Sequence, residues 1–160
     1  MHGFIPTVSA QSGETGPEFS LQNTRQISPG TFRTATAGIQ YRANPYSPNV
    51  NTWAVWRESE AGVGGWHTFL TQKLEPATWY KITLEADYTL NKYRTFSLSG
   101  GSLNVEVDLS PYNIALESKF SEEAFWATLE NENLWNNCGE AGIFDYQIHY
   151  DNLTVTKKNN

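Results

Sequence analysis

The feature that most constrains the fold of this chain is a strictly alternating run between Trp79 and Tyr88. Successive side chains of a β-strand point to opposite faces of a sheet, so this run predicts a strand with one buried and one solvated face. A strand of this kind needs neighbouring strands and a covering layer. The residues that share its apolar face are Tyr80, Ile82, Leu84, Ala86 and Tyr88.

Two further alternating runs follow directly along the chain. We expect strands over residues 93–98 and 103–109, connected by turns at 89–92 and 99–102. The second turn contains Gly100 and Gly101, which suit tight turns because glycine adopts backbone conformations that other residues avoid. Three successive antiparallel strands make a meander.

The pattern is less regular elsewhere, but it predicts strands over residues 32–41, 52–58 and 66–72. Residues 121–133 allow two interpretations. Ser121 could cap a helix, whereas Phe125, Ala127 and Leu129 alternate as in a strand, and the alternation favours the strand.

A last strand is expected near the C-terminal end of the chain. The residues Phe144, Tyr146, Ile148 and Tyr150 share one parity, whereas Leu153 and Val155 have the other. A β-bulge or a bend at Asp151–Asn152 is the simplest account of this change of parity.

Composition agrees with a sheet protein, because aromatic residues make up 14% of the 160 residues and twelve Gly and seven Pro supply turns. We therefore predict an all-β fold, a two-sheet antiparallel jelly-roll β-sandwich with little helix. It is expected to form a single domain over residues 17–156. Residues 1–16 are expected to be a loosely attached segment, and 157–160 a tail.

Charge and cysteine content exclude several classes of function. The formal net charge of −6 argues against binding to nucleic acid or to an anionic membrane surface, both of which need basic surface. No apolar run is long enough to insert into a membrane, and residues 1–10 lack a signal-peptide pattern. The single cysteine, Cys138, excludes an intrachain disulfide and a cysteine zinc site.

Two stretches carry a resemblance to known sandwich modules. Residues 75–80 lead into the alternating strand, and residues 148–155 close the chain. This arrangement resembles the jelly-roll modules of extracellular bacterial proteins, both the laminin-G-like or concanavalin-like sandwiches and the galactose-binding-like carbohydrate-binding modules. The resemblance implies an extracytoplasmic or secreted protein that binds a sugar, and it does not choose between the two topologies.

The resemblance also implies a calcium site. In the galactose-binding-like modules a structural Ca²⁺ ion joins an early acidic residue to an Asp of the closing strand, and the matching positions here are Glu18 and Asp151. Residues 103–156 contain ten acidic residues and a single Lys, and such oxygen ligands suit Ca²⁺. The alternative is an acidic, solvated surface.

The triplet Gln147–Ile148–His149 resembles the catalytic strand of the jelly-roll alginate lyases. In that family the Gln and the His neutralise a uronate and abstract a proton, which implies this role for Gln147 and His149. The alternative is that His149 is a solvent-facing strand residue.

A second candidate site is a concentration of aromatic and charged residues within one short stretch of the chain. Indole rings stack on sugar C–H surfaces, while Arg, His and carboxylate groups orient hydroxyl groups. The alternative is that these indoles fill the core between the sheets. The predicted ligand-binding residues of this stretch are Trp53, Trp56, Arg57, Glu58, Trp66 and His67.

Trp126 is a further candidate, because on a strand it shares a polar face with Thr128 and Glu130. Together these features predict a carbohydrate-binding or other small-ligand-binding module. The alternatives on the same scaffold are an alginate-type lyase, a calcium-dependent natural-product cyclase, and a purely structural accessory domain.

Overall fold

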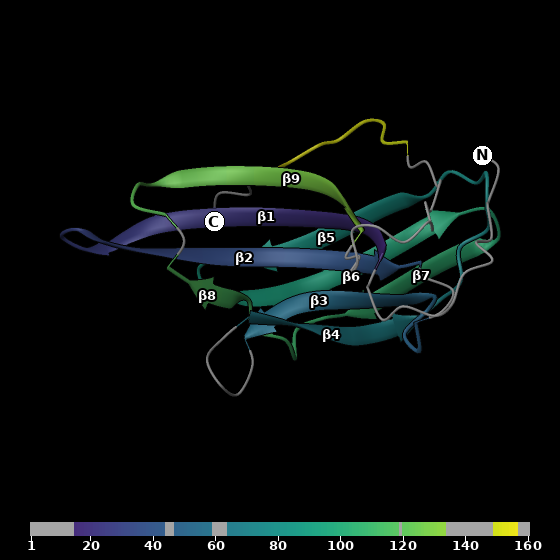
Figure 1. Cartoon of the computed structure of the whole chain (residues 1–160), viewed down its shortest axis with the longest axis horizontal. Helices are drawn as coiled ribbons and strands as arrows, with labels where there is room; N and C mark the ends of the chain where they lie inside the picture. The colour runs from purple at the N-terminus through teal and green to yellow at the C-terminus, as the bar shows by residue number, and fades with distance from the viewer. Residues whose placement is uncertain (1–14, 44–46, 59–63, 119, 134–148, 157–160) are drawn as a thin grey trace, which may run out of the picture.

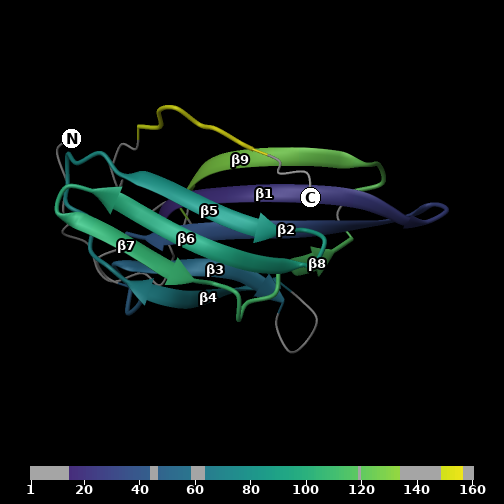
Figure 2. The same ribbon diagram turned by 180° about the vertical axis from the view of Figure 1, so that it is seen from behind.

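The computed structural model describes residues 15–43, 47–58, 64–118, 120–133 and 149–156, which form nine β-strands and no helix. The strands make two antiparallel sheets that pack face to face (Figures 1 and 2). The predicted all-β sandwich is confirmed at the level of this two-sheet architecture.

The larger sheet has six strands in the order β4–β3–β2–β1–β9, and β8 also pairs with β2. Strands β3 and β8 therefore share one edge of β2, one beyond the other. The strands of this sheet are β1 (Thr15–Ser28), β2 (Thr31–Arg42), β3 (Thr52–Glu58), β4 (Gly64–Thr71), β8 (Ala115–Glu117) and β9 (Ala124–Asn133).

The smaller sheet is the predicted meander, in the order β5 (Lys81–Asp87), β6 (Lys92–Gly100) and β7 (Leu103–Asp108). Both of its connections contain a residue with positive φ: Asn91 at 51° and Gly101 at 56°. Asn and Gly tolerate this conformation better than other residues, which explains why the chain reverses at these two points.

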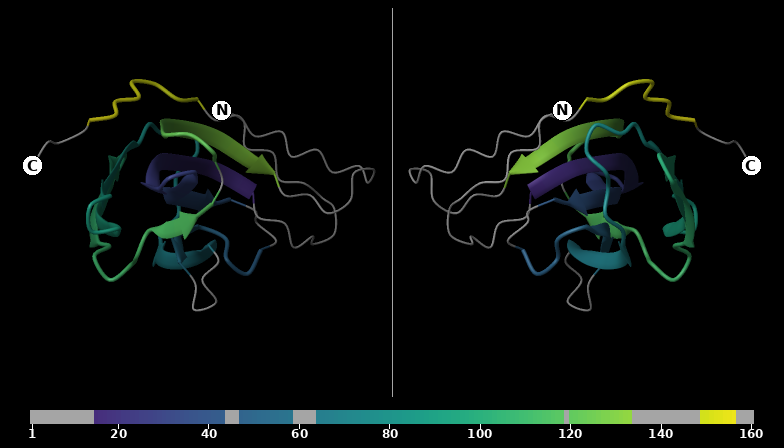
Figure 3. Two further views of the ribbon diagram at one scale, coloured as in Figure 1. Left: turned by 90° about the vertical axis from the view of Figure 1, so that its left-hand side faces the viewer. Right: turned by 90° about the vertical axis from the view of Figure 1, so that its right-hand side faces the viewer.

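The core lies between the two sheets, which Figure 3 shows end-on as two layers. The odd-numbered residues of β2 from Ala35 to Tyr41 face it, and Trp53 on β3 is fully buried there. The ring centroid of Trp53 lies 5.1 Å from that of Tyr41 and 5.0 Å from that of Phe96 on the opposite sheet. Aromatic contacts across the two layers therefore hold the sheets together.

Tyr93 makes a second link between the layers. Its side chain extends from β6 across the core and is fully buried. Its hydroxyl lies between β2 and β3. The hydroxyl accepts a hydrogen bond from the backbone N–H of Gly38 at 2.9 Å and donates to the backbone carbonyl of Trp56 at 2.6 Å. This contact lies near the point where β8 takes the place of β3 along β2.

The structure differs from the predicted strands at both ends of the chain. The predicted strand at Leu153 and Val155 is wrong, because residues 149–156 form no strand and both side chains are exposed. At the point where a bulge or a bend was expected, Asn152 has a positive φ of 55°, but residues 151–156 form neither. Strand β1 was not predicted, and it is the longest strand of the described residues.

Candidate functional site

The outer face of the six-stranded sheet, which points away from the three-stranded sheet, carries a polar surface. The even-numbered residues of β2 face outward because side chains alternate along a strand. These side chains are nevertheless buried, whereas the outer positions of a sandwich strand are normally solvated. The buried polar residues of β2 on this face are Thr34, Thr36, Gln40 and Arg42.

Hydrogen bonds between neighbouring strands organise this polar surface. The hydroxyls of Thr24 and Thr34 lie 3.0 Å apart. The hydroxyl of Thr36 donates to a carboxylate oxygen of Glu117 at 3.2 Å. Near the other end of β2, the guanidinium of Arg42 donates to the hydroxyl of Thr68 at 2.9 Å. Cross-strand bonds of this kind fix the side chains of the face in place.

An open hollow of about 260 Å³ lies on this face at strands β1 and β9. The rings of Phe120 and Trp126 stack there, with centroids 6.1 Å apart and ring planes at 19°. The Trp126 side chain is half exposed, at 51%. The hollow is lined by Gln22, Phe120, Trp126 and Thr128.

The chemistry of this hollow suits an uncharged, amphipathic ligand. Two nearly parallel aromatic rings offer an apolar surface, and the amide of Gln22 and the hydroxyl of Thr128 can both donate and accept hydrogen bonds. None of the four lining side chains carries a charge. We call this group of residues the β9 hollow.

A second aromatic pair, Trp56 and Trp66, occupies the same face nearer its other edge. The two residues are direct partners on β3 and β4, and their ring centroids lie 5.2 Å apart in an edge-to-face arrangement. Glycine makes room for them: a Cβ on Gly64 would lie 2.4 Å from the Trp56 ring. The indole nitrogen of Trp56 is buried and has no hydrogen-bond partner among the described residues.

Two carboxylates also meet on this face. Glu18 on β1 is the direct partner of Glu130 on β9. Side chains that are directly opposed on antiparallel strands have Cβ atoms about 4.5–5.5 Å apart, so these two acids are near neighbours. Gln40 on β2 is the partner of Glu18 on its other side.

The predicted cluster around Trp56 is divided between two faces of the sheet. Trp56, Glu58 and Trp66 have the parity of the outer face, whereas Arg57 and His67 have the opposite parity. Trp53 lies in the core, which was the alternative for these indoles. The structure therefore does not form one pocket from this stretch, although it places Trp56 and Trp66 together.

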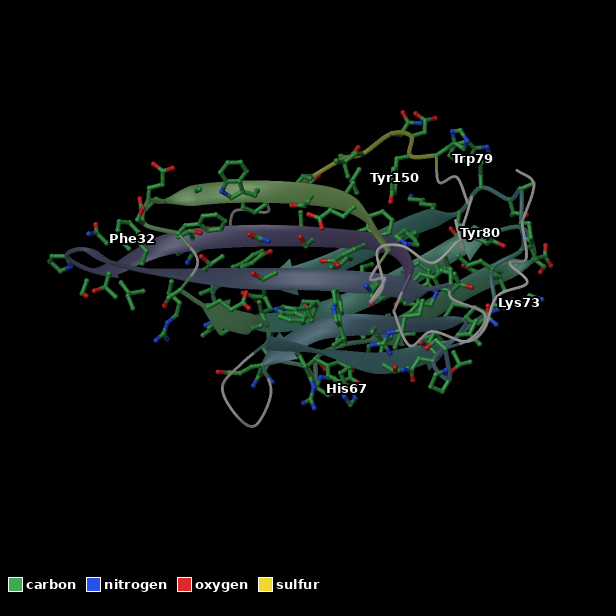
Figure 4. The ribbon with its side chains drawn as sticks, viewed as in Figure 1. Phe32, His67, Lys73, Trp79, Tyr80 and Tyr150 are labelled. Atoms are coloured by element: carbon green, nitrogen blue, oxygen red, sulfur yellow. The ribbon has the colours of Figure 1, made fainter. Side chains whose placement is uncertain are left out.

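His67 lies on β4, at the far side of the sheet from β9 (Figure 4). Its ring centroid is 5.3 Å from that of Tyr112. Partial burial, followed by the positive charge of Arg57, lowers the pKa of His67 below its usual value. Neither of these contacts connects His67 to the β9 hollow.

The residues predicted near the C-terminal end are only partly described. His149 is exposed, and Gln147 lies outside the described residues. Asp151 is exposed, and its neighbour Tyr150 packs edge-to-face on Phe19, which points into the core. The lyase role of Gln147 and His149 stays a prediction.

The calcium site also stays a prediction. Glu18 belongs to the outer face of β1, whereas Tyr150, next to Asp151, contacts the inner side of that strand. No group of three or more His, Cys, Asp or Glu residues that could hold a metal occurs in the part of the chain that the structure describes.

Sequence patterns identified only one residue of the β9 hollow, Trp126. Phe120 precedes β9 and belongs to no periodic run, so no pattern pointed to it. Gln22 belongs to the strand that was not predicted. Only the pairing of β1 with β9, in which Gln22 is the partner of Trp126, brings these residues together.

The described residues include no helix long and apolar enough to cross a membrane. Comparison with protein-family models, with curated proteins and with solved structures found no match to this chain.

Proposed function

We propose that this protein binds a neutral carbohydrate on the outer face of its six-stranded sheet, with the β9 hollow as the primary contact. The observation that carries the proposal is the half-exposed, stacked pair of Phe120 and Trp126 beside two uncharged polar side chains. Sugars present C–H surfaces that pack on aromatic rings and hydroxyls that exchange hydrogen bonds with amides and hydroxyls.

Electrostatics supports a neutral rather than an acidic sugar. The net charge of the chain is −6, and Glu130 lies on β9 two residues beyond Thr128 of the hollow. An anionic polysaccharide would approach against this charge without a cationic side chain in the hollow lining to receive it. We therefore expect neutral glucans, xylans or mannans to bind more tightly than alginate.

Affinity electrophoresis in gels containing one soluble polysaccharide at a time tests this proposal. The Trp126→Ala variant should lose at least about tenfold in affinity, equivalent to about 1.4 kcal/mol. The matched control is Trp79→Ala, which removes an even more exposed indole, 66% exposed, from the loop before β5. This control should bind like the unmodified protein.

Fold integrity is checked on the same variants by urea unfolding. Both indoles are largely exposed, so each Ala substitution should change the free energy of unfolding by less than about 1 kcal/mol. Equal affinities of Trp126→Ala and the unmodified protein would contradict the proposal. A loss of affinity confined to the Trp79→Ala variant would indicate that the binding site lies in the loop before β5.

A second candidate function is glycoside hydrolysis on the same face, favoured by the direct pairing of Glu18 with Glu130. The two carboxyl groups of retaining glycosidases lie about 5–5.5 Å apart, a separation within reach of directly opposed strand residues. Release of reducing ends from a bound polysaccharide, abolished in both Glu18→Gln and Glu130→Gln, would support it. Binding without release would leave the binding function alone.

A further inference from the structure

Arg57 on β3 is a cation without a counter-charge in the described part of the chain. The residue is only partly exposed, and its guanidinium forms no ion pair or hydrogen bond with another described residue. Arg94, by comparison, is paired with Asp87 at 2.8 Å. Partial burial removes water from a charged group, so charges in such positions are normally paired. The guanidinium of Arg57 is therefore suited to receive an anion from outside the chain.

Two further polar groups lie near Arg57, each from a different segment of the chain. Arg57 is the direct partner of Gly65 on β4, so His67, two residues beyond Gly65, is its diagonal neighbour on the same face. Figure 4 shows His67 on β4, which is an edge strand of the sheet. The third group is Tyr112, in the connection between β7 and β8, whose ring centroid lies 5.3 Å from that of His67.

Backbone contacts hold the connection that carries Tyr112 in place. The N–H of Tyr93 donates to the carbonyl of Tyr112 at 3.2 Å, and the N–H of Tyr112 donates to the carbonyl of Leu109 at 2.9 Å. Ile114, two residues further on, forms an isolated β-bridge with Arg57 itself. The connection is therefore joined to both β6 and β3, so the three groups are positioned before a ligand arrives.

Open space lies beside Arg57 on this face of the sheet. A side chain at position 65 would project to the same side as Arg57, because directly opposed residues of antiparallel strands share a face. The residue there is glycine, and a Cβ on Gly65 would meet no atom within 4 Å. The corresponding space at Gly64 is filled, since a Cβ there would lie 2.4 Å from the Trp56 ring. The space at Gly65 can therefore admit a small ligand.

The acidic residues nearest in sequence to these groups are directed elsewhere. Glu58, next to Arg57, has the parity of the outer face. The carboxylate of Asp108, at the end of β7, accepts hydrogen bonds from the N–H and the hydroxyl of Ser110 at 2.8 and 3.0 Å. Partial burial, and after it the positive charge of Arg57, lower the pKa of His67. The local charge is therefore positive, although the chain as a whole carries a net charge of −6.

We propose that Arg57, His67 and Tyr112 form a binding site for a small oxyanion, a ligand that presents a carboxylate or a phosphate group. A guanidinium forms paired hydrogen bonds with two oxygens of such a group, and an imidazole N–H and a phenol O–H donate to further oxygens. Strand β4 lies at the opposite edge of the sheet from β9, so this site is separate from the β9 hollow. The proposal does not depend on sugar binding.

An NMR titration of the full chain tests the site. Sodium phosphate and sodium acetate are added separately at constant pH, with sodium chloride adjusted to keep the ionic strength constant. The imidazole C–H signals of His67 and of the exposed His149 are followed, each assigned by substitution. We expect a saturable shift of the His67 signal with at least one anion and none for His149. A shift with phosphate alone would assign the site to phosphate groups, and with acetate alone to carboxylates.

Arg57→Gln removes the guanidinium and should weaken anion binding at least about tenfold. The matched control is Arg33→Gln, which removes one positive charge from an exposed position near the start of β2 and should bind like the unmodified protein. The absence of a saturable His67 shift with either anion would overturn the proposal. Equal affinities of Arg57→Gln and Arg33→Gln would also overturn it.

A second variant covers the case in which Arg57→Gln does not fold. Gly65→Val leaves every charge in place and puts two methyl groups into the open space beside Arg57. Anion affinity should fall at least about tenfold, while the far-ultraviolet dichroism stays that of the unmodified protein. Anion binding that is unchanged by Gly65→Val would show that the ligand does not occupy this space and would refute the site.

Discussion

The hydroxyl of Tyr93 connects β2 and β3 through two hydrogen bonds. Tyr93→Phe would leave the N–H of Gly38 and the carbonyl of Trp56 without their buried partner. Leaving buried backbone groups unsatisfied costs about 1–3 kcal/mol, so we expect a loss of about 2 kcal/mol in urea unfolding.

Tyr80→Phe is the control for this prediction, because the Tyr80 hydroxyl accepts its hydrogen bond from the N–H of Glu75 at an exposed position. Its loss should cost less than about 0.5 kcal/mol, the range of ordinary surface substitutions. If the two variants lose the same stability, the bridging role of Tyr93 is wrong.

Burial of two tyrosines also predicts how the protein responds to alkaline pH. Burial raises the pKa of Tyr88 and of Tyr93 well above the ordinary value. The pKa of each of these tyrosines is therefore higher in the folded protein than in the unfolded chain. The free energy of unfolding is unaffected by them below about pH 10 and falls as the pH rises further, since the unfolded chain releases these protons first.

We therefore expect the phenolate absorbance at 295 nm to rise in two stages. Exposed tyrosines titrate first, and the remaining absorbance appears together with the loss of the circular dichroism signal. A single smooth titration of all eight tyrosines near pH 10, with the fold intact, would contradict the buried positions of Tyr88 and Tyr93.

Two adjacent glycines give a matched test of the packing around Trp56. Gly64→Ala would bring a Cβ to 2.4 Å from the indole, whereas a Cβ on Gly65 meets nothing within 4 Å. Overpacking of this kind costs about 1–3 kcal/mol, so Gly64→Ala should lower the urea midpoint and change the near-ultraviolet dichroism of the Trp56–Trp66 pair. Gly65→Ala should do neither; similar effects of both changes would refute the close contact.

At the scale of elements, alternation predicted β5 and β7, each of which has one consistently apolar face. The expected strand over 52–58 matches β3, and residues 121–133, which allowed a helix, contain strand β9 because β1 pairs with it. Strand β1 was missed because Asn23 and Arg25 interrupt the apolar alternation after Phe19 and Leu21, which leaves too short a run to predict a strand.

The candidate site was less predictable from the sequence than the strands were. Residues that are close in sequence were grouped around Trp56, but neighbours along a strand face opposite ways, which separates Arg57 from Trp56. The β9 hollow combines residues about a hundred positions apart, Gln22 and Trp126, and only the sheet register brings them together. A single sequence carries no direct record of that register.

Strand β2 should be the most stable element of the sheet. It pairs with β1, β3 and β8, and all its residues from Thr34 to Arg42 are buried. Its amide protons should exchange with solvent only on global unfolding, while those of β4, at the sheet edge, exchange through local opening. Hydrogen-exchange mass spectrometry measures both; equal protection of β2 and β4 would contradict this order.

At the scale of the whole molecule, the two faces of the six-stranded sheet have different roles. The inner face, with Trp53, packs on the three-stranded sheet and supplies stability, and the outer face carries the β9 hollow and the Trp56–Trp66 pair. An indole on the outer face can therefore change without loss of the core. This separation makes the binding proposal testable on the intact fold.

The most direct test uses the indole N–H signals of the six tryptophans in a ¹H–¹⁵N correlation spectrum. Each signal is assigned by single substitution, and a neutral oligosaccharide that binds is titrated into the labelled protein. We expect the Trp126 signal to shift most, while those of Trp53 in the core and Trp79 in the loop before β5 stay in place. Saturable binding that shifts the Trp79 signal and leaves the Trp126 signal in place would contradict the assignment of the ligand to the outer face.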